Sequence, residues 1–282
     1  MAVAEDSAPV LRDVSGPSAL GGGRRRALEL LYVIAVTDFK RTYFGTALGY
    51  MWSLARPLLT FGVLLVVFTH IVRFTVPHYP EFLLFNIVLF GFFQEATMLA
   101  VGSIVGHESI VRKTQFPRLV IPLAVVCTTL FNLLPSLVVA FVFLLASGVA
   151  PEPSWLLLSV IMVLLLGFTT AVSMTVSALY PRFRDIGIIW GVLSLALFYA
   201  TPVLYPMWHV SSTLRDVIAL NPLAPVFELT QRWITEPSAP WPGAAAVGGP
   251  ARLAFAAALY ATVCVLAVWI FRREAPRIAE AL

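Results

Sequence analysis

The sequence predicts an all-α integral membrane protein with six transmembrane helices. Of its 282 residues, 59% are hydrophobic and only 12% are charged, whereas about a quarter of the residues in a soluble domain carry charge. The apolar residues fall in runs of about 20, the length that a helix needs to cross roughly 30 Å of hydrocarbon. Within lipid, only helices and closed barrels satisfy every backbone hydrogen-bonding group, and apolar runs this long favour helices.

The N-terminal residues 1–26 are rich in Gly, Ala, Ser and Pro and contain no apolar core of the length that a secretory signal needs. We expect them to form a disordered cytoplasmic tail. Between residues 26 and 44, apolar side chains recur at i, i+3 and i+4, with Lys40 and Arg41 on the opposite side. This pattern predicts an amphipathic helix lying in the membrane interface. A short extra span is the alternative, which Asp38, Lys40 and Arg41 disfavour.

The six predicted spans cover residues 48–72, 82–105, 119–146, 155–180, 186–205 and 253–271. Arg56 and Pro57 interrupt the first of them. The segment 206–252 is much longer than the other connections, and loops of this length are usually functional or disordered. Its apolar stretches at 214–220 and 227–234 predict short amphipathic helices. The spans and these helices form one transmembrane domain, residues 27–272, which is followed by a C-terminal tail, 273–282.

The distribution of Lys and Arg predicts the orientation, because cytoplasmic loops of membrane proteins are enriched in basic residues. With both termini in the cytoplasm, 15 of the 19 Lys and Arg residues lie inside. We therefore expect a multi-pass membrane protein whose N- and C-termini are both cytoplasmic. The net charge of +4 is explained by this inner-side enrichment, and no nucleic-acid partner is expected.

The motifs of a catalytic domain are absent from the sequence. Arg112 stands before Lys113-Thr114 where a phosphate-binding loop needs Gly, no His pair has zinc spacing, and no metal site is expected. An enzyme acting on a polyprenyl-linked sugar would need acidic residues gathered at one membrane face, whereas Asp38, Asp185 and Asp216 are isolated in sequence. These observations predict a protein that is not itself an enzyme.

Glu95 is the one carboxylate well inside a predicted span. Ionisable groups at membrane depth are costly and face a partner helix or a water-filled cavity. We favour an interhelical hydrogen bond over a pore or coupling role for this side chain. A proton-coupled secondary transporter is the alternative that Glu95 leaves open.

Four stretches, taken in order, resemble the permease family of ABC exporters for lipid-linked polysaccharides. They are TDFKRTYFGTALGYMWSLARPLL (37–59), ESIVRKTQFPRLVIPLA (108–124), YPRFRDI (180–186), and TPVLYP (201–206) followed by LNPLAPVFELTQRW (220–233). The resemblance covers roughly residues 28–272. The sequence differs from this family at Arg56, because such permeases frequently have Asn before the proline. The long Arg side chain can reach the lipid headgroups.

The resemblance implies a permease subunit that pairs with a second copy of itself and with two ATP-binding subunits. ATP and Mg²⁺ would be used by the partner, and no cofactor would be bound by this chain. The cytoplasmic loop 108–118 is the expected coupling element, with contacts to the ATPase from Glu108, Ile110, Arg112, Lys113, Phe116, Pro117 and Arg118. Arg184 and Asp185 belong to the cytoplasmic turn before the fifth span. The simpler interpretation is that the basic residues of this loop reflect only the general enrichment of Lys and Arg on the cytoplasmic side, without a role in coupling.

The resemblance also implies that the first, second and fifth spans line the translocation path. Aromatic faces can stack on sugar rings, and the candidates for lining the path are Phe85, Phe92, Phe93, Glu95, Phe198 and Tyr199. Core packing is an equally good interpretation of each Phe. Lys40, Arg41 and Arg56 are expected to contact lipid headgroups or the pyrophosphate of a lipid carrier.

The expected function is therefore export of a lipid-linked polysaccharide, such as O-antigen or teichoic acid, or of a related glycolipid. An exporter of a drug or small lipid with the same fold is the closest alternative, and a proton-coupled transporter is a more distant one. The resemblance also implies that the protein lies in the bacterial inner (plasma) membrane.

Overall fold

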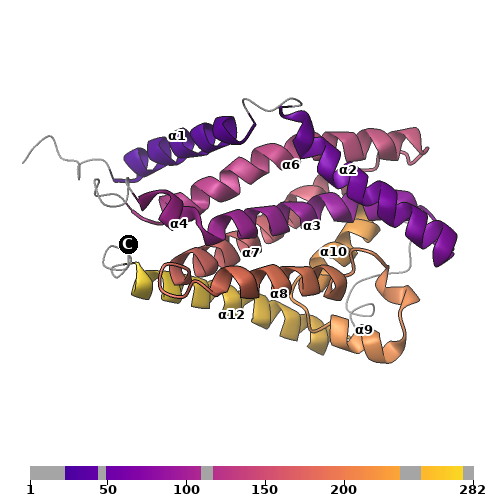
Figure 1. The fold of residues 1–282 in the computed structure, drawn as a ribbon. Coiled ribbons are helices and arrows are strands. Elements are labelled where there is room, and N and C mark those ends of the chain that lie inside the picture. Colours follow the sequence, from indigo (N-terminus) through magenta and orange to yellow (C-terminus); the bar gives the residue numbers. More distant parts are fainter. Residues whose placement is uncertain (1–22, 44–48, 109–116, 236–248, 276–282) are drawn as a thin grey trace, which may run out of the picture.

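The computed structural model describes residues 23–43, 49–108, 117–235 and 249–275, which form helices joined by turns without a strand among them (Figure 1). Five helical segments are long and apolar enough to cross a membrane: 51–71, 79–101, 120–146, 153–179 and 250–274. A sixth apolar helix, α8 (Ile186–Ala200), is shorter. The predicted all-α membrane fold is confirmed. The proposed tails lie mainly outside the described residues.

The elements follow the chain in this order: α1 (Gly23–Tyr43), α2 (Met51–Val66) with the π-helical η1 (Val67–Ile71), α3 (Tyr79–Val101), α4 (Ser103–Gly106), α6 (Val120–Ala146), the 3-10 helix η2 (Pro153–Leu157), α7 (Leu158–Leu179), α8, the 3-10 helix η3 (Met207–His209), α9 (Ser212–Ile218), α10 (Ala224–Thr230), the π-helical η4 (Gln231–Thr235) and α12 (Pro250–Glu274). The short helices α9 and α10–η4 confirm the two amphipathic helices predicted between the last two spans.

Helix α3 is the centre of the bundle, in contact with α2, α6, α7 and α8 (Figure 1). Its apolar residues surround the helix on nearly every side, which is typical of a helix buried in a membrane protein core. Phe85, Phe90 and Phe93 are fully buried. By contrast, no residue of α2 is buried by the described part of the chain, so one side of the bundle keeps a large uncovered apolar face.

A proline in α6 explains how the start of α2 is anchored. Pro135 has no backbone N–H, so the carbonyl of Phe131, four residues earlier, loses its helical donor. The hydroxyl of Tyr50 donates a hydrogen bond to this carbonyl. The ring of Phe39 packs edge-on against both Tyr50 and Phe131. The end of α1, the start of α2 and the middle of α6 therefore meet where the proline removes a helical hydrogen bond from α6.

The amphipathic helix predicted near the N-terminus is observed as α1, which lies beside α6 (Figure 1). Ile34 and Ala35 are buried against Val120 and Ala124. The hydroxyl of Thr128 donates to the carbonyl of Ala35 at 3.1 Å. Helix α1 is thus packed lengthwise onto the first turns of α6.

The fifth predicted span, residues 186–205, is longer than the helix observed. Helix α8 ends at Ala200, and Thr201 is extended, with φ −103° and ψ 144°. Pro202 explains this ending, because a residue that precedes proline is disfavoured in the helical region. Residues 201–207, here called the buried strap, are non-helical up to the start of η3, yet all but Tyr205 are buried.

Candidate functional site

Beyond its first turn, the surface of α3 is buried except for one stripe along its second half. Gly91, Gln94 and Glu95 are partly exposed, and Met98 and Leu99 are exposed. Their spacing of three, four and seven residues places them on one face of the helix. Apart from the partly exposed Pro80 at its start, α3 offers side chains to anything outside the described bundle only along this stripe, whose centre is polar.

Glu95 is held by a side chain from another helix. The amide nitrogen of Asn132, on α6, donates a hydrogen bond to Glu95 Oε1 at 2.8 Å. The interhelical hydrogen bond predicted for Glu95 is therefore present, between α6 and α3. The amide oxygen of Asn132 is buried without a partner among the described residues, and such an orphan acceptor costs about 1–3 kcal/mol. The unpaired oxygen of Asn132 therefore lowers the stability of the fold, while its amide nitrogen orients the carboxylate of Glu95.

Arg56 lies on α2, which packs against α3, and its charge acts on this carboxylate. Its positive charge interacts electrostatically with Glu95. Within the described residues, however, the guanidinium forms no hydrogen bond or ion pair at contact distance with Glu95. Arg56 itself is exposed. We refer to Arg56, Gln94, Glu95 and Asn132 together as the polar slot.

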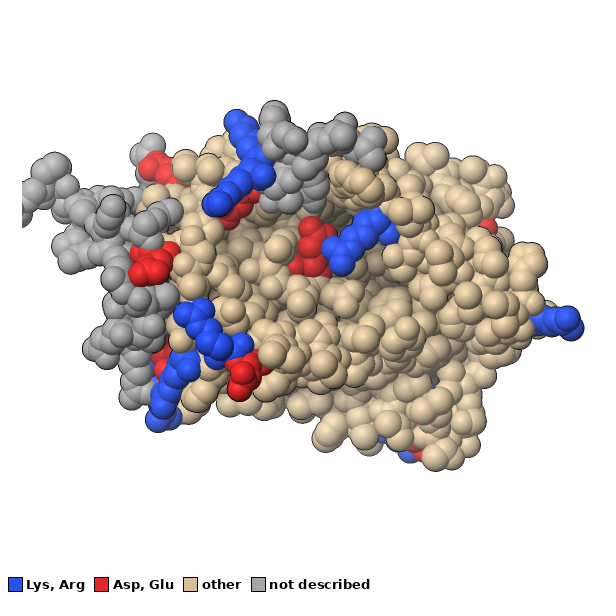
Figure 2. Space-filling view, viewed as in Figure 1, with Lys and Arg blue, Asp and Glu red and all other residues tan. Residues whose placement is uncertain are grey.

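Figure 2 shows how unusual charge is on this face of the molecule. Away from its α4 end the surface is almost entirely uncharged, and one basic and one acidic side chain lie together beside a hollow near its centre. Isolated charges are rare in membrane-facing segments because of their desolvation cost, and they usually face a partner or a water-filled space. The polar slot holds two such charges, Arg56 on α2 and Glu95 on α3, and it is therefore our main candidate for a functional site.

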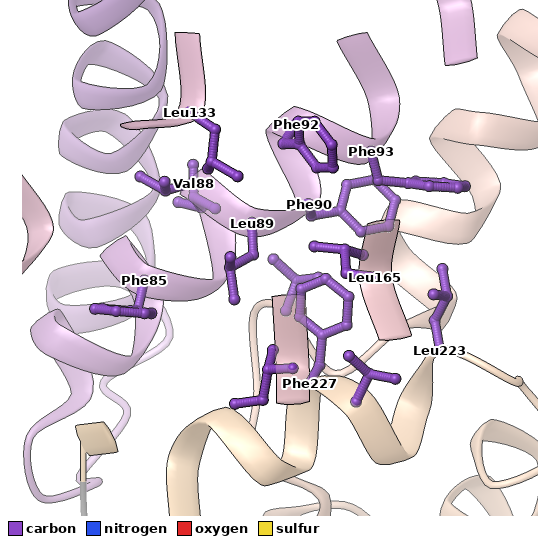
Figure 3. Close-up of a cluster of buried hydrophobic side chains, with 14 of the residues drawn as sticks. Phe85, Val88, Leu89, Phe90, Phe92, Phe93, Leu133, Leu165, Leu223 and Phe227 are labelled. Atoms are coloured by element: carbon purple, nitrogen blue, oxygen red, sulfur yellow. The ribbon is translucent and has the colours of Figure 1, made fainter. Parts of the chain in front are cut away.

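The aromatic candidates divide into two groups. Phe85, Phe92 and Phe93 lie inside the bundle and are at most 4% exposed, which favours the core-packing interpretation in this conformation (Figure 3). Phe93 packs against Phe90, Phe168 and Trp190. Phe198 is partly buried against Phe90, whereas Tyr199 on α8 is exposed to 57%. Among these aromatic side chains, only Tyr199 offers most of its surface to a partner or cargo.

The buried strap is a second unusual feature. Irregular backbone inside a membrane protein requires that its polar groups find partners within the protein. The hydroxyl of Tyr79 donates to Leu204 O at 2.9 Å, and the Asn221 amide donates to Ala200 O and to Thr201 Oγ1. Side chains from α3 and from the turn before α10 therefore replace the missing helical hydrogen bonds.

Arg215 holds the far end of this strap. Its Nε donates to Met207 O at 3.0 Å, and one terminal nitrogen donates to the carbonyls of Trp208 and Val210, each at 3.1 Å. Glu228, a buried residue of α10, accepts a hydrogen bond from the Met207 N–H. Burial raises the pKa of Glu228 to about 7, although the Met207 hydrogen bond and the nearby Arg215 charge oppose this rise.

The other predicted site residues lie toward the α4 end of the bundle. Lys40 and Arg41 are exposed on the last turn of α1. Arg184 and Asp185 are exposed before α8, with the Arg184 guanidinium 5.2 Å from the centre of the Tyr180 ring. In the proposed coupling loop, Glu108, Pro117 and Arg118 are described, whereas Ile110, Arg112, Lys113 and Phe116 lie outside the described residues.

Sequence reasoning missed the partners of these groups. Asn132 was hidden within an apolar run, and its polarity at span depth was the only available signal. Nothing in the sequence indicated that Tyr79 and Asn221 meet the same segment, because 125 and 20 residues separate them from their acceptors.

The arrangement of apolar helices around a central α3, with a polar slot and a buried strap, is that of a membrane transport protein. Residues 29–232 match the family described as ABC-2 type transporter. The chain is 33% identical over 200 residues to the O-antigen export system permease protein RfbA of Klebsiella pneumoniae, covering 70% of this chain and 76% of the relative. It is 31% identical over 200 residues to the protein of the same name from Myxococcus xanthus, covering 69% and 75%.

A more distant relative is the polysialic acid transport protein KpsM of Escherichia coli, 24% identical over 199 residues, with 68% of this chain and 76% of KpsM covered. The chain belongs to the ABC-2 type transporter family.

Proposed function

We propose that this chain is the permease subunit of an ATP-driven exporter that moves a lipid-linked polysaccharide or a related glycolipid from the cytoplasmic side across the cell membrane. The observation that carries the proposal is its similarity to permeases named for O-antigen export, at 31–33% identity over 200 residues. The polar slot supports it, because a hydroxyl-rich cargo needs polar contacts along an otherwise apolar protein.

The proposed orientation places both termini and the α4 end of the bundle in the cytoplasm. It is supported by the 15 of 19 basic residues that this orientation puts inside. The loop 109–116 lies between α4, which ends at Gly106, and α6, which begins at Val120, and these two helices are in contact with each other. In this orientation the loop faces the cytoplasm, where an ATPase subunit would dock on Glu108, Ile110, Arg112, Lys113, Phe116, Pro117 and Arg118.

Two ATP-binding subunits and a second copy of this chain complete the proposed exporter. The ATPase subunits would use ATP and Mg²⁺, and this chain would bind neither. The uncovered apolar faces of α2 and α8 support the second copy, because such faces are covered in a membrane by lipid or by another protein. Exposed Lys40 and Arg41 would contact anionic headgroups or the pyrophosphate of the carrier.

The test is export by the permease with its ATPase in reconstituted vesicles. We expect export to require ATP and both proteins. Replacing Arg112 and Lys113 by Glu should release the ATPase during copurification, while the same charge reversal at exposed Arg73, at the other end of the bundle, should not. ATP-independent transport that Glu95→Gln abolishes would instead establish a proton-coupled transporter. ATP-dependent export of a drug or small lipid, without export of glycan, would establish the closest alternative.

A further inference from the structure

The polar slot has a hydrogen-bonding character that narrows the kind of ligand it can take. A guanidinium offers only donors, a carboxylate offers only acceptors, and a glutamine amide offers both. Helix α2 packs against α3, so Arg56 on α2 and Gln94 and Glu95 on the exposed stripe of α3 bring these three groups to one region. Within the described residues, the Gln94 amide has no hydrogen-bond partner, and Glu95 uses one oxygen for Asn132. The slot therefore has both donor and acceptor groups that are available to a ligand.

The charges of the slot compensate each other. A lone guanidinium would favour a phosphate, whose oxygens only accept hydrogen bonds. Here the Glu95 carboxylate lies within the electrostatic range of Arg56, and it would repel a phosphate placed between them. A hydroxyl group both donates and accepts, so it can donate to Glu95 while it accepts from Arg56. The slot therefore favours a neutral, hydroxyl-rich ligand over an anion.

The geometry supports the same ligand class. Arg, Glu and Gln side chains are planar with two adjacent polar atoms, which suits the neighbouring hydroxyls of a sugar ring. Trp52 lies one turn before Arg56 on the same face of α2 and exposes 49% of its surface. Its indole ring offers an apolar face on which the C–H side of a sugar can stack. The amide nitrogen of Asn132 holds Glu95 in place by a hydrogen bond from α6, and the amide oxygen of Asn132 has no partner among the described residues.

We infer that Arg56, Gln94 and Glu95, with Asn132 as a positioning residue, form a binding site for the hydroxyl groups of a sugar residue of the cargo. This inference rests on the proposed function, since it names the part of the glycan that the slot contacts. It assigns to Arg56 a role in a compensated pair, in place of the headgroup or pyrophosphate contact that its charge alone suggests.

The first test is photocrosslinking in cells that make the glycan, with the full-length permease and its ATPase. A benzophenone amino acid at Gln94 should crosslink to glycan, detected by a carbohydrate stain on the permease band, at least five times more than one at Val163. Val163 is the control because it is 69% exposed on α7, away from the slot. Equal labelling at the two positions would overturn the inference.

The second test is export by variants that keep or remove hydrogen-bonding groups. Glu95→Gln should keep at least a third of parental export, because the amide still binds hydroxyls, whereas Glu95→Leu should lose at least tenfold. Arg56→Gln leaves Glu95 uncompensated and should lose at least tenfold. The double variant Arg56→Gln/Glu95→Gln should recover to within threefold of Glu95→Gln, because a neutral amide pair still binds hydroxyls.

The outcomes separate the possible ligands. A pyrophosphate contact predicts that the double variant exports as little as Arg56→Gln, and a proton site predicts that Glu95→Gln exports nothing; either result would overturn the inference, as would parental export by Glu95→Leu. Copurification of the ATPase with each variant controls for assembly. If the parent chain neither binds an ATPase nor exports glycan, the proposed function has failed before the slot is tested.

Discussion

His107 Nε2 lies 3.4 Å from a carboxylate oxygen of Asp38, and His107 Nδ1 lies 2.9 Å from the carbonyl oxygen of Ser103. A carbonyl and a carboxylate both only accept, so the arrangement is favourable in the imidazolium form, in which both ring nitrogens carry a hydrogen. This contact joins α1 to the end of α4, directly before the proposed coupling loop. Thr128 ties the previous turn of α1 to α6. Helix α1 is thus connected to the bundle on both sides of the loop.

Removing the Asp38 charge should loosen α1. We expect Asp38→Asn to weaken the contact by about 1 kcal/mol, since both side chains are partly exposed. Amide hydrogen exchange over residues 30–41 should then become faster in the purified protein, while exchange in α7 stays unchanged. Thr37→Ser, on an exposed position of the same helix, is the control. If Asp38→Asn and Thr37→Ser exchange alike, the contact does not hold α1.

Arg215→Lys should destabilise the buried strap although the charge is kept. A planar guanidinium donates to three carbonyls at once, which a lysine ammonium on a flexible stem cannot reproduce. Met207 is fully buried, and its carbonyl left without a donor costs about 1–3 kcal/mol. Limited proteolysis should cleave residues 201–215 at least tenfold faster than in the parent. Arg73→Lys, at an exposed position, should not change the rate, and equal rates in the two variants would refute this role of Arg215.

Glu228 should make the stability of the strap depend on pH. Its folded-state pKa of about 7 lies above the ordinary carboxyl value because of burial. Protonated Glu228 therefore stabilises the folded state. This contribution is fully present below about pH 4.5, the ordinary carboxyl value, and is lost as the pH rises through 7. The total effect is on the order of 3 kcal/mol. We expect thermal unfolding at a higher temperature at pH 5 than at pH 8, and Glu228→Gln should stabilise the protein at pH 8 and flatten the dependence. An unchanged pH profile in Glu228→Gln would contradict the assignment.

The contact between α7 and α12 depends on a glycine. A Cβ atom at Gly167 would lie 2.6 Å from the Tyr260 hydroxyl, which donates to Leu164 O at 2.8 Å. Gly167→Ala should therefore destabilise the protein by about 1–3 kcal/mol through overpacking, and Tyr260→Phe by about 1 kcal/mol through the lost hydrogen bond. Because the double variant has no clash, its loss should be smaller than the sum of the single losses. Thermal unfolding of the four proteins measures this coupling, and strictly additive losses would argue against the clash.

Much of the fold could be predicted because membrane helices are encoded locally. A helix that spans lipid needs a long apolar run, and the run is visible in the sequence whatever lies beside it. The fifth span shows the limit of this reasoning. Hydropathy continues past Ala200 into the apolar residues Val203 and Leu204, so the run looked longer than α8, which ends before Pro202. A run of apolar residues indicates that a segment is buried, but it does not show that the segment is helical. The buried strap is buried and not helical.

The aromatic candidates illustrate a second limit. Composition marks Phe85, Phe93 and Tyr199 as equally able to contact a sugar, but α3 turns Phe85 and Phe93 into the core, while α8 leaves Tyr199 exposed. The direction that a residue faces depends on the neighbours of its helix, and helices surrounded by other helices carry no amphipathic signal of that direction.

By itself, the sequence determined the all-α membrane class, the approximate spans, the amphipathic N-terminal helix and the polarity of Glu95, because each follows from the local cost of placing residues in lipid. Only the tertiary structure decided which groups meet. It brought Asn132 to Glu95 and the charge of Arg56 near it, and it brought Tyr79 to the strap. These contacts join different helices, and in a bundle such contacts depend on side-chain packing between segments far apart in the chain.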